Sequence, residues 1–366
     1  MVTGPENTRY IVPSLSDLAI RLHAFAITMQ SPHITTLGVT MNHHKSTTLP
    51  DHVLVLGIFL MALSLGLPTQ AEDKWWPSRW GADDRLGAVN LLSDEKTHAA
   101  AQLVKTGKSY ALGINSGPDT PAGADLTPRS FSLAVVQPGQ LLGKTFASNG
   151  FGFNDDIVHA WLGVGTQIDG LGHVGIHNRY YNGIKAEEFI TYTGLTQFAL
   201  HEMPPIATRG VLLDIARYKN KAFLEAGEVI TVEDIKGAAT RQGVTIGEGD
   251  IVLFNTGWMK TKLHSDPDLF NHKEPGLGVA GAQYLIDKGV VAMGADTFGL
   301  EAAPGEDPDI LFPVHQLMLV KHGVYVLENI RTEELAADQA WEFLLVIGIP
   351  KYVGAVQAII NPIAIR

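Results

Sequence analysis

The 366-residue chain contains no cysteine. That absence excludes disulfides, thiolate nucleophiles and cysteine-ligated zinc, and it suits a protein exposed to an oxidising compartment. Charged residues are also scarce, at 18%, and the acids outnumber the bases to give a formal net charge of -11. No Lys/Arg-rich run or basic face is visible, which argues against nucleic acid or an anionic membrane surface as a partner. With 45% hydrophobic residues, the chain can bury the core of one large or two small domains.

Several catalytic motifs are missing as well. The sequence has no G-x-S-x-G nucleophile elbow, no P-loop and no G-x-G-x-x-G that opens a helix after a strand. These absences argue against nucleotide and nicotinamide chemistry. A hydrolase without cysteine then needs a serine triad, a carboxylate pair or a metal-bound water.

One long apolar run, HVLVLGIFLMALSLGL, covers residues 52–67. It is shorter than the about 20 residues that a transmembrane helix needs. Small residues at Thr69 and Ala71 follow it at the positions that a signal peptidase reads. We predict a secretory signal peptide over residues 41–71, cleaved after Ala71, and hence a periplasmic or secreted protein with no membrane attachment after cleavage. An uncleaved anchor is the alternative. Residues 1–40 are predicted to be a non-native or disordered extension.

Strand and helix patterns alternate through residues 72–366 without a linker, a repeat or a low-complexity segment. Continuous apolar runs in RGVLLDIA (209–216) and DIVLFNTGW (250–258) are typical of buried strands. Ser93 and Thr231 are capping residues that indicate two helix starts. The alternation predicts one mixed α/β domain with a substantial sheet.

The segment GVGTQIDGLGHVG, residues 163–175, places Asp169 and His173 four positions apart among five glycines. Glycine allows unusual backbone angles and close approach, which suits a site that must admit a substrate. Asp169 is therefore a candidate metal ligand. His173 is a candidate general acid or base beside a bound water.

Two further candidate ligands lie near the C-terminus. His315 opens a predicted helix and Glu328 ends the strand that follows it. A turn at Gly323 can fold the helix back onto the strand and bring the two side chains together. Asp, His and Glu from separate segments form a ligand set compatible with Zn²⁺ or Mn²⁺.

Each candidate also has an ordinary structural role open to it, and spacing alone does not force them into one site. Asp169 could cap a turn, and His173 could be a solvated neighbour of His177. For the later pair the alternatives are a helix cap at His315 and an ion pair between Glu328 and Arg331.

Several segments taken together resemble the cyclase family of metal-dependent hydrolases, which contains kynurenine formamidase and isatin hydrolase. The segments that carry the resemblance are WGADDRLGAVNLLSDEK (80–96), GTQIDGLGH (165–173), YYNG (180–183), the two apolar runs and HQLMLVKHGVYVLEN (315–329). The resemblance implies a swivelling β/β/α-type single domain over residues 72–366, with a mixed, barrel-like sheet core flanked by helices. It also implies a homodimer or homotetramer.

The resemblance implies roles for four residues: metal ligation by Asp169, His315 and Glu328, and acid/base catalysis by His173. This chain departs from the family pattern at the first two signature histidines, which are Gly163 and Gln167 here. Glycine cannot ligate, and glutamine offers only an amide oxygen. We therefore expect a single divalent ion, Zn or Mn, with Gln167 as a further ligand.

The expected reaction is hydrolysis of a C–N bond in a small amide or lactam, or of a related lactone. A metal-activated water would attack, and His173 would move the proton. Candidates for an apolar, aromatic substrate pocket are Trp161, Trp258 and Phe298. The alternative, motivated by Gly163 and Gln167, is a periplasmic small-molecule-binding protein that has lost one metal site and catalysis.

Overall fold

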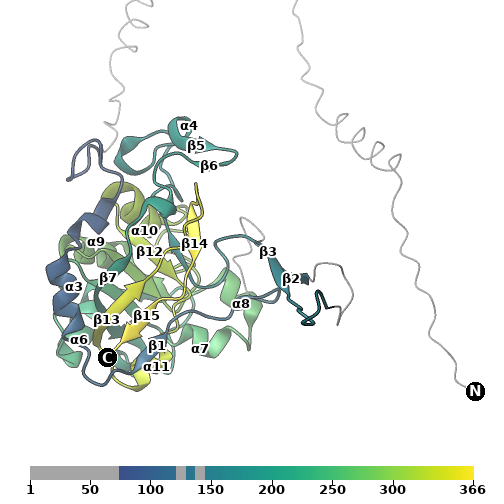
Figure 1. Ribbon diagram of the computed structural model, residues 1–366. Coiled ribbons are helices and arrows are strands. Elements are labelled where there is room, and N and C mark those ends of the chain that lie inside the picture. The colour runs from purple at the N-terminus through teal and green to yellow at the C-terminus, as the bar shows by residue number, and fades with distance from the viewer. Residues whose placement is uncertain (1–73, 121–128, 137–144) are drawn as a thin grey trace, which may run out of the picture. The chain divides into compact units, whose positions relative to one another are not determined.

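The computed structural model describes residues 74–120, 129–136 and 145–366 of the chain (Figure 1). The chain from Glu72 to Arg366 forms one compact unit. The predicted extension (1–40) and signal peptide (41–71) lie outside the described residues. Among the described residues, none of the helices has the length and apolar character needed to span a bilayer.

A nine-stranded sheet forms the centre of this unit. In spatial order its strands are β1 (Ser109–Ala111), β15 (Ile363–Ile365), β13 (Glu342–Ile347), β7 (Ile206–Asp214), β9 (Ile251–Asn255), β11 (Ala292–Ala295), β12 (Tyr325–Glu328), β4 (Gln167–Asp169) and β14 (Gln357–Ile359). The neighbours β7, β9, β11 and β12 run parallel. The strands on both sides of them pair antiparallel. The sheet is therefore mixed, with a parallel centre.

Helices and short strand pairs surround the sheet. The short pairs are β2 (Phe131–Val136) with β3 (Asp155–Ala160), β5 (Ile190–Thr191) with β6 (Gly194–Leu195), and β8 (Val229–Ile230) with β10 (Gly276–Leu277). The α-helices are α3 (Asp94–Ala101), α4 (Ala186–Phe189), α5 (Ile215–Tyr218), α6 (Val232–Gln242), α7 (Trp258–Lys262), α8 (Pro267–His272), α9 (Val279–Asp287), α10 (Pro313–His315) and α11 (Glu333–Ala337). Short 3-10 segments are η1 (Gly87–Leu91), η2 (Tyr181–Gly183) and η3 (Leu200–Glu202), and η4 (Gln316–His322) is a π-helix. Helices α3, α6 and α9 lie along one side of the sheet (Figure 1).

The local sequence explains the main elements. Strands β11 and β12 are buried at every position, and β9 at all but its last, as expected for parallel strands covered on both faces. Ser93 caps α3 by accepting a hydrogen bond from the Lys96 backbone N–H, and Thr231 forms a capping box with Asp234 at the start of α6. These features confirm the predicted buried strands and helix starts. The fold is the predicted one: a single mixed α/β domain whose sheet curls into a half-barrel flanked by helices.

Candidate metal site

Strand register brings four polar side chains to one face of the sheet. Gln167 and Asp169 are two residues apart in β4, so their side chains point the same way. Strand β4 lies between β12 and β14, with Gln167 opposite Glu328 and Asp169 opposite Gln357. Directly opposed residues share a face, so two carboxylates and two amides meet there.

Hydrogen bonds fix these four groups relative to one another. Gln167 Nε2 donates to Glu328 Oε2 at 2.6 Å and to Asp169 Oδ1 at 3.2 Å. Gln357 Nε2 donates to the same Asp169 oxygen at 2.8 Å. The amides therefore hold both carboxylates in place while the other oxygen of Asp169 stays available.

The turn at Gly323 brings His315 to this face. Gly323 ends η4 with φ of 64°, a left-handed conformation that glycine adopts at little cost, and the chain then enters β12. As a result His315 Nε2 lies 3.3 Å from Glu328 Oε1 and 3.6 Å from Asp169 Oδ2. The predicted turn at Gly323 therefore does bring His315 and Glu328 together.

The cluster fits a divalent cation. Asp169, His315 and Glu328 each offer a ligand atom, and these atoms lie within 4.8 Å of one another. Four ligands around Zn²⁺ at about 2.1 Å stand about 3.4 Å apart, close to the distances from His315 Nε2 to Glu328 and to Asp169. Asp169 Oδ2 and Gln167 Oε1 are buried without a hydrogen-bond partner in the described part of the chain. Such lone pairs are costly to bury, and a cation would satisfy them.

A carboxylate that the sequence did not point to orients His315. Glu301 Oε1 lies 2.5 Å from His315 Nδ1. The same carboxylate accepts hydrogen bonds from the backbone N–H groups of Val314 and His315, at 2.9 and 3.0 Å. Metal-ligating histidines commonly donate their second ring N–H to a carboxylate in this way. Glu301 thereby leaves His315 Nε2 to face Asp169 and Glu328.

The charges in the cluster are strongly coupled. Burial, together with the negative charge of Asp169, raises the pKa of Glu328 to about 7. Burial also opposes ionisation of Asp169, but His173 and His315 hold the pKa of that carboxyl below its ordinary range. Burial lowers the pKa of His315, yet the neighbouring carboxylates of Asp169, Glu301 and Glu328 outweigh it and raise that pKa well above its ordinary value. A cation bound here would compete with these protons, so its affinity should depend on pH.

His173 lies at the edge of the cluster. Its Nε2 is 3.9 Å from Asp169 Oδ2, and its side chain is 22% exposed. Burial lowers the pKa of His173 despite the opposing charge of Asp169. The imidazole therefore has access both to the cluster and to solvent, and its lowered pKa favours the neutral form that can accept a proton.

The three aromatic residues predicted to line a pocket lie in two different places. Trp161 is 47% exposed and stands two residues before Gly163. Trp258 is fully buried in a small core cluster with Phe270, and Phe298 packs against that cluster. Contact of these side chains with a substrate stays a prediction. Of the alternative structural roles, the Glu328–Arg331 pair does not form, because Arg331 pairs with Glu333 and Glu334 instead.

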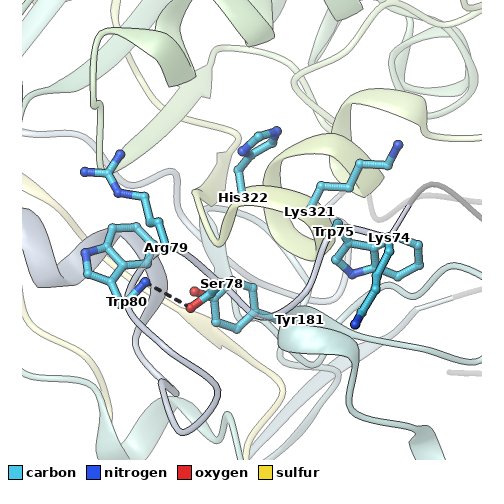
Figure 2. Close-up of a pocket in the computed structure, with 8 residues that line it drawn as sticks. All are labelled: Lys74, Trp75, Ser78, Arg79, Trp80, Tyr181, Lys321 and His322. Carbon is cyan, nitrogen blue, oxygen red and sulfur yellow. Dashed lines mark hydrogen bonds between the residues drawn. The ribbon is translucent and has the colours of Figure 1, made fainter.

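Two surface pockets lie apart from the cluster, and none of its candidate ligands lines either one. A pocket of about 320 Å³ is lined by Lys74, Trp75, Ser78, Arg79, Trp80, Tyr181, Lys321 and His322. Figure 2 shows Arg79 and Trp80 on one side of it and Lys74 and Trp75 on the other. The second, of about 460 Å³, includes Asp296 and Arg331.

Comparison with known proteins identifies the family. A family model described as "Putative cyclase" matches residues 65–302, so the chain belongs to that family. A crystal structure described as a novel cyclase is 30% identical with a TM-score of 0.71, covering 79% of this chain and 98% of that one. Isatin hydrolase A from Labrenzia aggregata, bound to benzyl benzoate, is 18% identical with a TM-score of 0.53, covering 72% and 94%. An isatin hydrolase bound to the product analogue thioisatinate is 20% identical with a TM-score of 0.51, covering 75% and 98%. The two isatin hydrolases share the fold. No curated protein matches the chain.

Proposed function

We propose that this protein is a metal-dependent hydrolase that cleaves a C–N bond of a small amide or lactam, or a related lactone. The observation that carries the proposal is the buried Asp169 Oδ2, which accepts no hydrogen bond from the described residues and faces His315 Nε2 at the spacing of ligands around one ion. Isatin hydrolases of the same fold support the reaction class.

The site residues have two roles, metal binding and proton transfer. Asp169, His315 and Glu328 would hold Zn²⁺ or Mn²⁺, and Gln167 Oε1 is the candidate for a further ligand. The bound ion would polarise the scissile carbonyl and lower the pKa of a water. His173 takes the proton from the attacking water and returns it to the leaving nitrogen or oxygen.

Paired substitutions separate these roles. His173→Ala should keep the metal and lose turnover, whereas Asp169→Ala should lose both. His177→Asn is the matched control, because His177 is exposed and its φ of 47° suits asparagine. Elemental analysis after supplementation with Zn²⁺ or Mn²⁺ measures the metal, and a panel of small amides and lactones measures turnover. Full activity of His173→Ala would remove its assigned role, and absence of bound metal would favour the binding protein over the hydrolase.

We propose that the protein is exported and cleaved after Ala71. The support is the apolar run at residues 52–67 followed by small residues at Thr69 and Ala71. N-terminal sequencing of protein recovered from the cell envelope or medium should begin at Glu72. A chain that starts upstream of the apolar run would contradict cleavage.

We propose further that the protein is a homo-oligomer. The β2–β3 hairpin exposes Leu133, Val135, Ile157 and Val158 by 49, 69, 61 and 53%. Neighbouring exposed apolar side chains of this kind mark interaction surfaces. Sedimentation velocity should show a dimer or tetramer that Val135→Asp weakens, and a monomer at micromolar concentration would refute the assembly.

A further inference from the structure

An arginine fills the space that the side chain at position 163 would otherwise take. A Cβ added to Gly163 would lie 2.8 Å from Arg129 Nη1 and 3.0 Å from its Cζ. The same nitrogen donates a hydrogen bond to the Gly163 carbonyl oxygen at 2.6 Å. The absence of a side chain at Gly163 therefore lets the guanidinium lie directly against the backbone that leads into β4.

Arg129 forms no direct ion pair with a carboxylate among the described residues. The side chain is half-buried, and its hydrogen bond to Gly163 is the one contact of that kind that the described residues give it. A guanidinium has five N–H donors, so several remain available. A partly buried charge without a carboxylate is uncommon, because it is desolvated without compensation.

The guanidinium stands next to the candidate metal site. The added Cβ at Gly163 would also lie 2.9 Å from Gln357 Oε1, and Gln357 Nε2 bonds to Asp169. One amide thus separates Arg129 from a candidate ligand.

We propose that Arg129 binds a carboxylate of the substrate, so that the preferred substrates are amides, lactams or lactones bearing a carboxylate near the scissile bond. This inference rests on the proposed hydrolase function. Arginine matches a carboxylate with two parallel N–H donors, which fixes the orientation of the bound group as well as its position. The scissile carbonyl would then be presented to the ion-binding cluster from a fixed direction.

The test compares two ligands that share an aryl amide and differ in one carboxylate, phthalamate and phthalamide. Calorimetry on metal-supplemented protein should show that wild type binds phthalamate about 10- to 100-fold more tightly. Arg129→Met should bind the two ligands equally, and Arg129→Lys should restore part of the preference. Arg79→Met is the matched control, because Arg79 lies in the separate basic pocket (Figure 2).

Three results would overturn the inference. The first two are a wild type that does not prefer phthalamate and an Arg129→Met protein that keeps the preference. The second result, with a lowered melting temperature, would make Arg129 a structural anchor for the base of the β2–β3 hairpin. Loss of the preference in Arg79→Met alone would place the anion in the other pocket and overturn the inference as well. The proposed hydrolase function is tested separately, because calorimetry reports binding and does not require turnover. Metal analysis of the protein shows whether the ion is bound, and chromatography of the ligand recovered after the titration shows whether it has been hydrolysed.

Discussion

Removing the Glu301 carboxylate should weaken metal binding although Glu301 is not itself a candidate ligand. Glu301→Ala takes the partner from His315 Nδ1, so the ring is free to rotate or to protonate Nε2 instead. Loss of such an orienting carboxylate typically costs about 10- to 100-fold in metal affinity. That range corresponds to about 1.4 to 2.8 kcal/mol of binding free energy.

The same substitution should also lower stability. Glu301 is 5% exposed, and it accepts from two backbone N–H groups besides the imidazole. A buried donor left without a partner costs about 1–3 kcal/mol, so a loss of roughly 2–5 kcal/mol is expected for the metal-free protein. Glu301→Gln is the control: its amide oxygen can still accept from His315 Nδ1, so both losses should be smaller.

Competition with a chelating dye measures the apparent Kd for Zn²⁺ or Mn²⁺, and urea denaturation of the metal-free protein measures stability. The two readouts are independent, because a merely structural Glu301 would lower stability and leave the Kd of the folded protein unchanged. A Glu301→Ala protein that is folded and binds metal within twofold of wild type would refute the orienting role.

Four other changes have defined outcomes. Removing the metal with a chelator should lower Tm in proportion to the logarithm of the metal concentration that was present, as scanning calorimetry can test. Burial raises the pKa of Asp296 from 3.8 to about 6, so the folded state holds this proton more tightly and stability falls as pH rises between these values. Asp296→Asn should therefore remove a decrease of up to roughly 3 kcal/mol in the free energy of unfolding between pH 4 and pH 7. Urea denaturation measures this free energy, and an equal pH dependence in both proteins would contradict the expectation. Ser93→Ala should cost about 1 kcal/mol in urea denaturation by removing the cap of α3. Gly210→Ala places a Cβ 2.1 Å from Phe343 Cε2 in the core and should lower the free energy of unfolding by about 1–3 kcal/mol. An unchanged free energy in urea denaturation would contradict this and show that the ring moves aside.

The elements that the sequence predicts are those whose determinants are local. The strand β9 follows from a continuous apolar run, and α6 follows from Thr231 at one end and Gly243 at the other, where φ is 71°. The proximity of His315 and Glu328 was also predictable, because a single turn at Gly323 joins the two segments. Local hydrogen bonding and hydrophobic burial are encoded within a few residues, so they can be recognised without the fold.

The residues that sequence reasoning missed depend on long-range pairing. Gln357 meets Asp169 only because β14 pairs with β4 from 188 residues away along the chain. Glu301 reaches His315 from a loop after β11, and no spacing rule in the sequence connects the two. Arg129 has no recognisable motif, and its position beside Gly163 depends on how the chain enters β2 and β4. The period of hydrophobic residues and the capping residues identify single helices and strands, but they do not show which distant segments pair with one another.

The two departures from the pattern that the resemblance implies, Gln167 and Gly163, have different physical consequences. At position 167 a neutral amide donates to both carboxylates, so it restrains Asp169 and Glu328 without adding a charge. At position 163 the missing side chain makes room for the Arg129 guanidinium, which does add one. A histidine restored at 163 would have to displace that guanidinium, because its Cβ alone would meet Arg129 Nη1 at 2.8 Å. Gly163 and Arg129 are therefore coupled, so the stability cost of Gly163→His in the wild-type chain should be larger than its cost in an Arg129→Ala background.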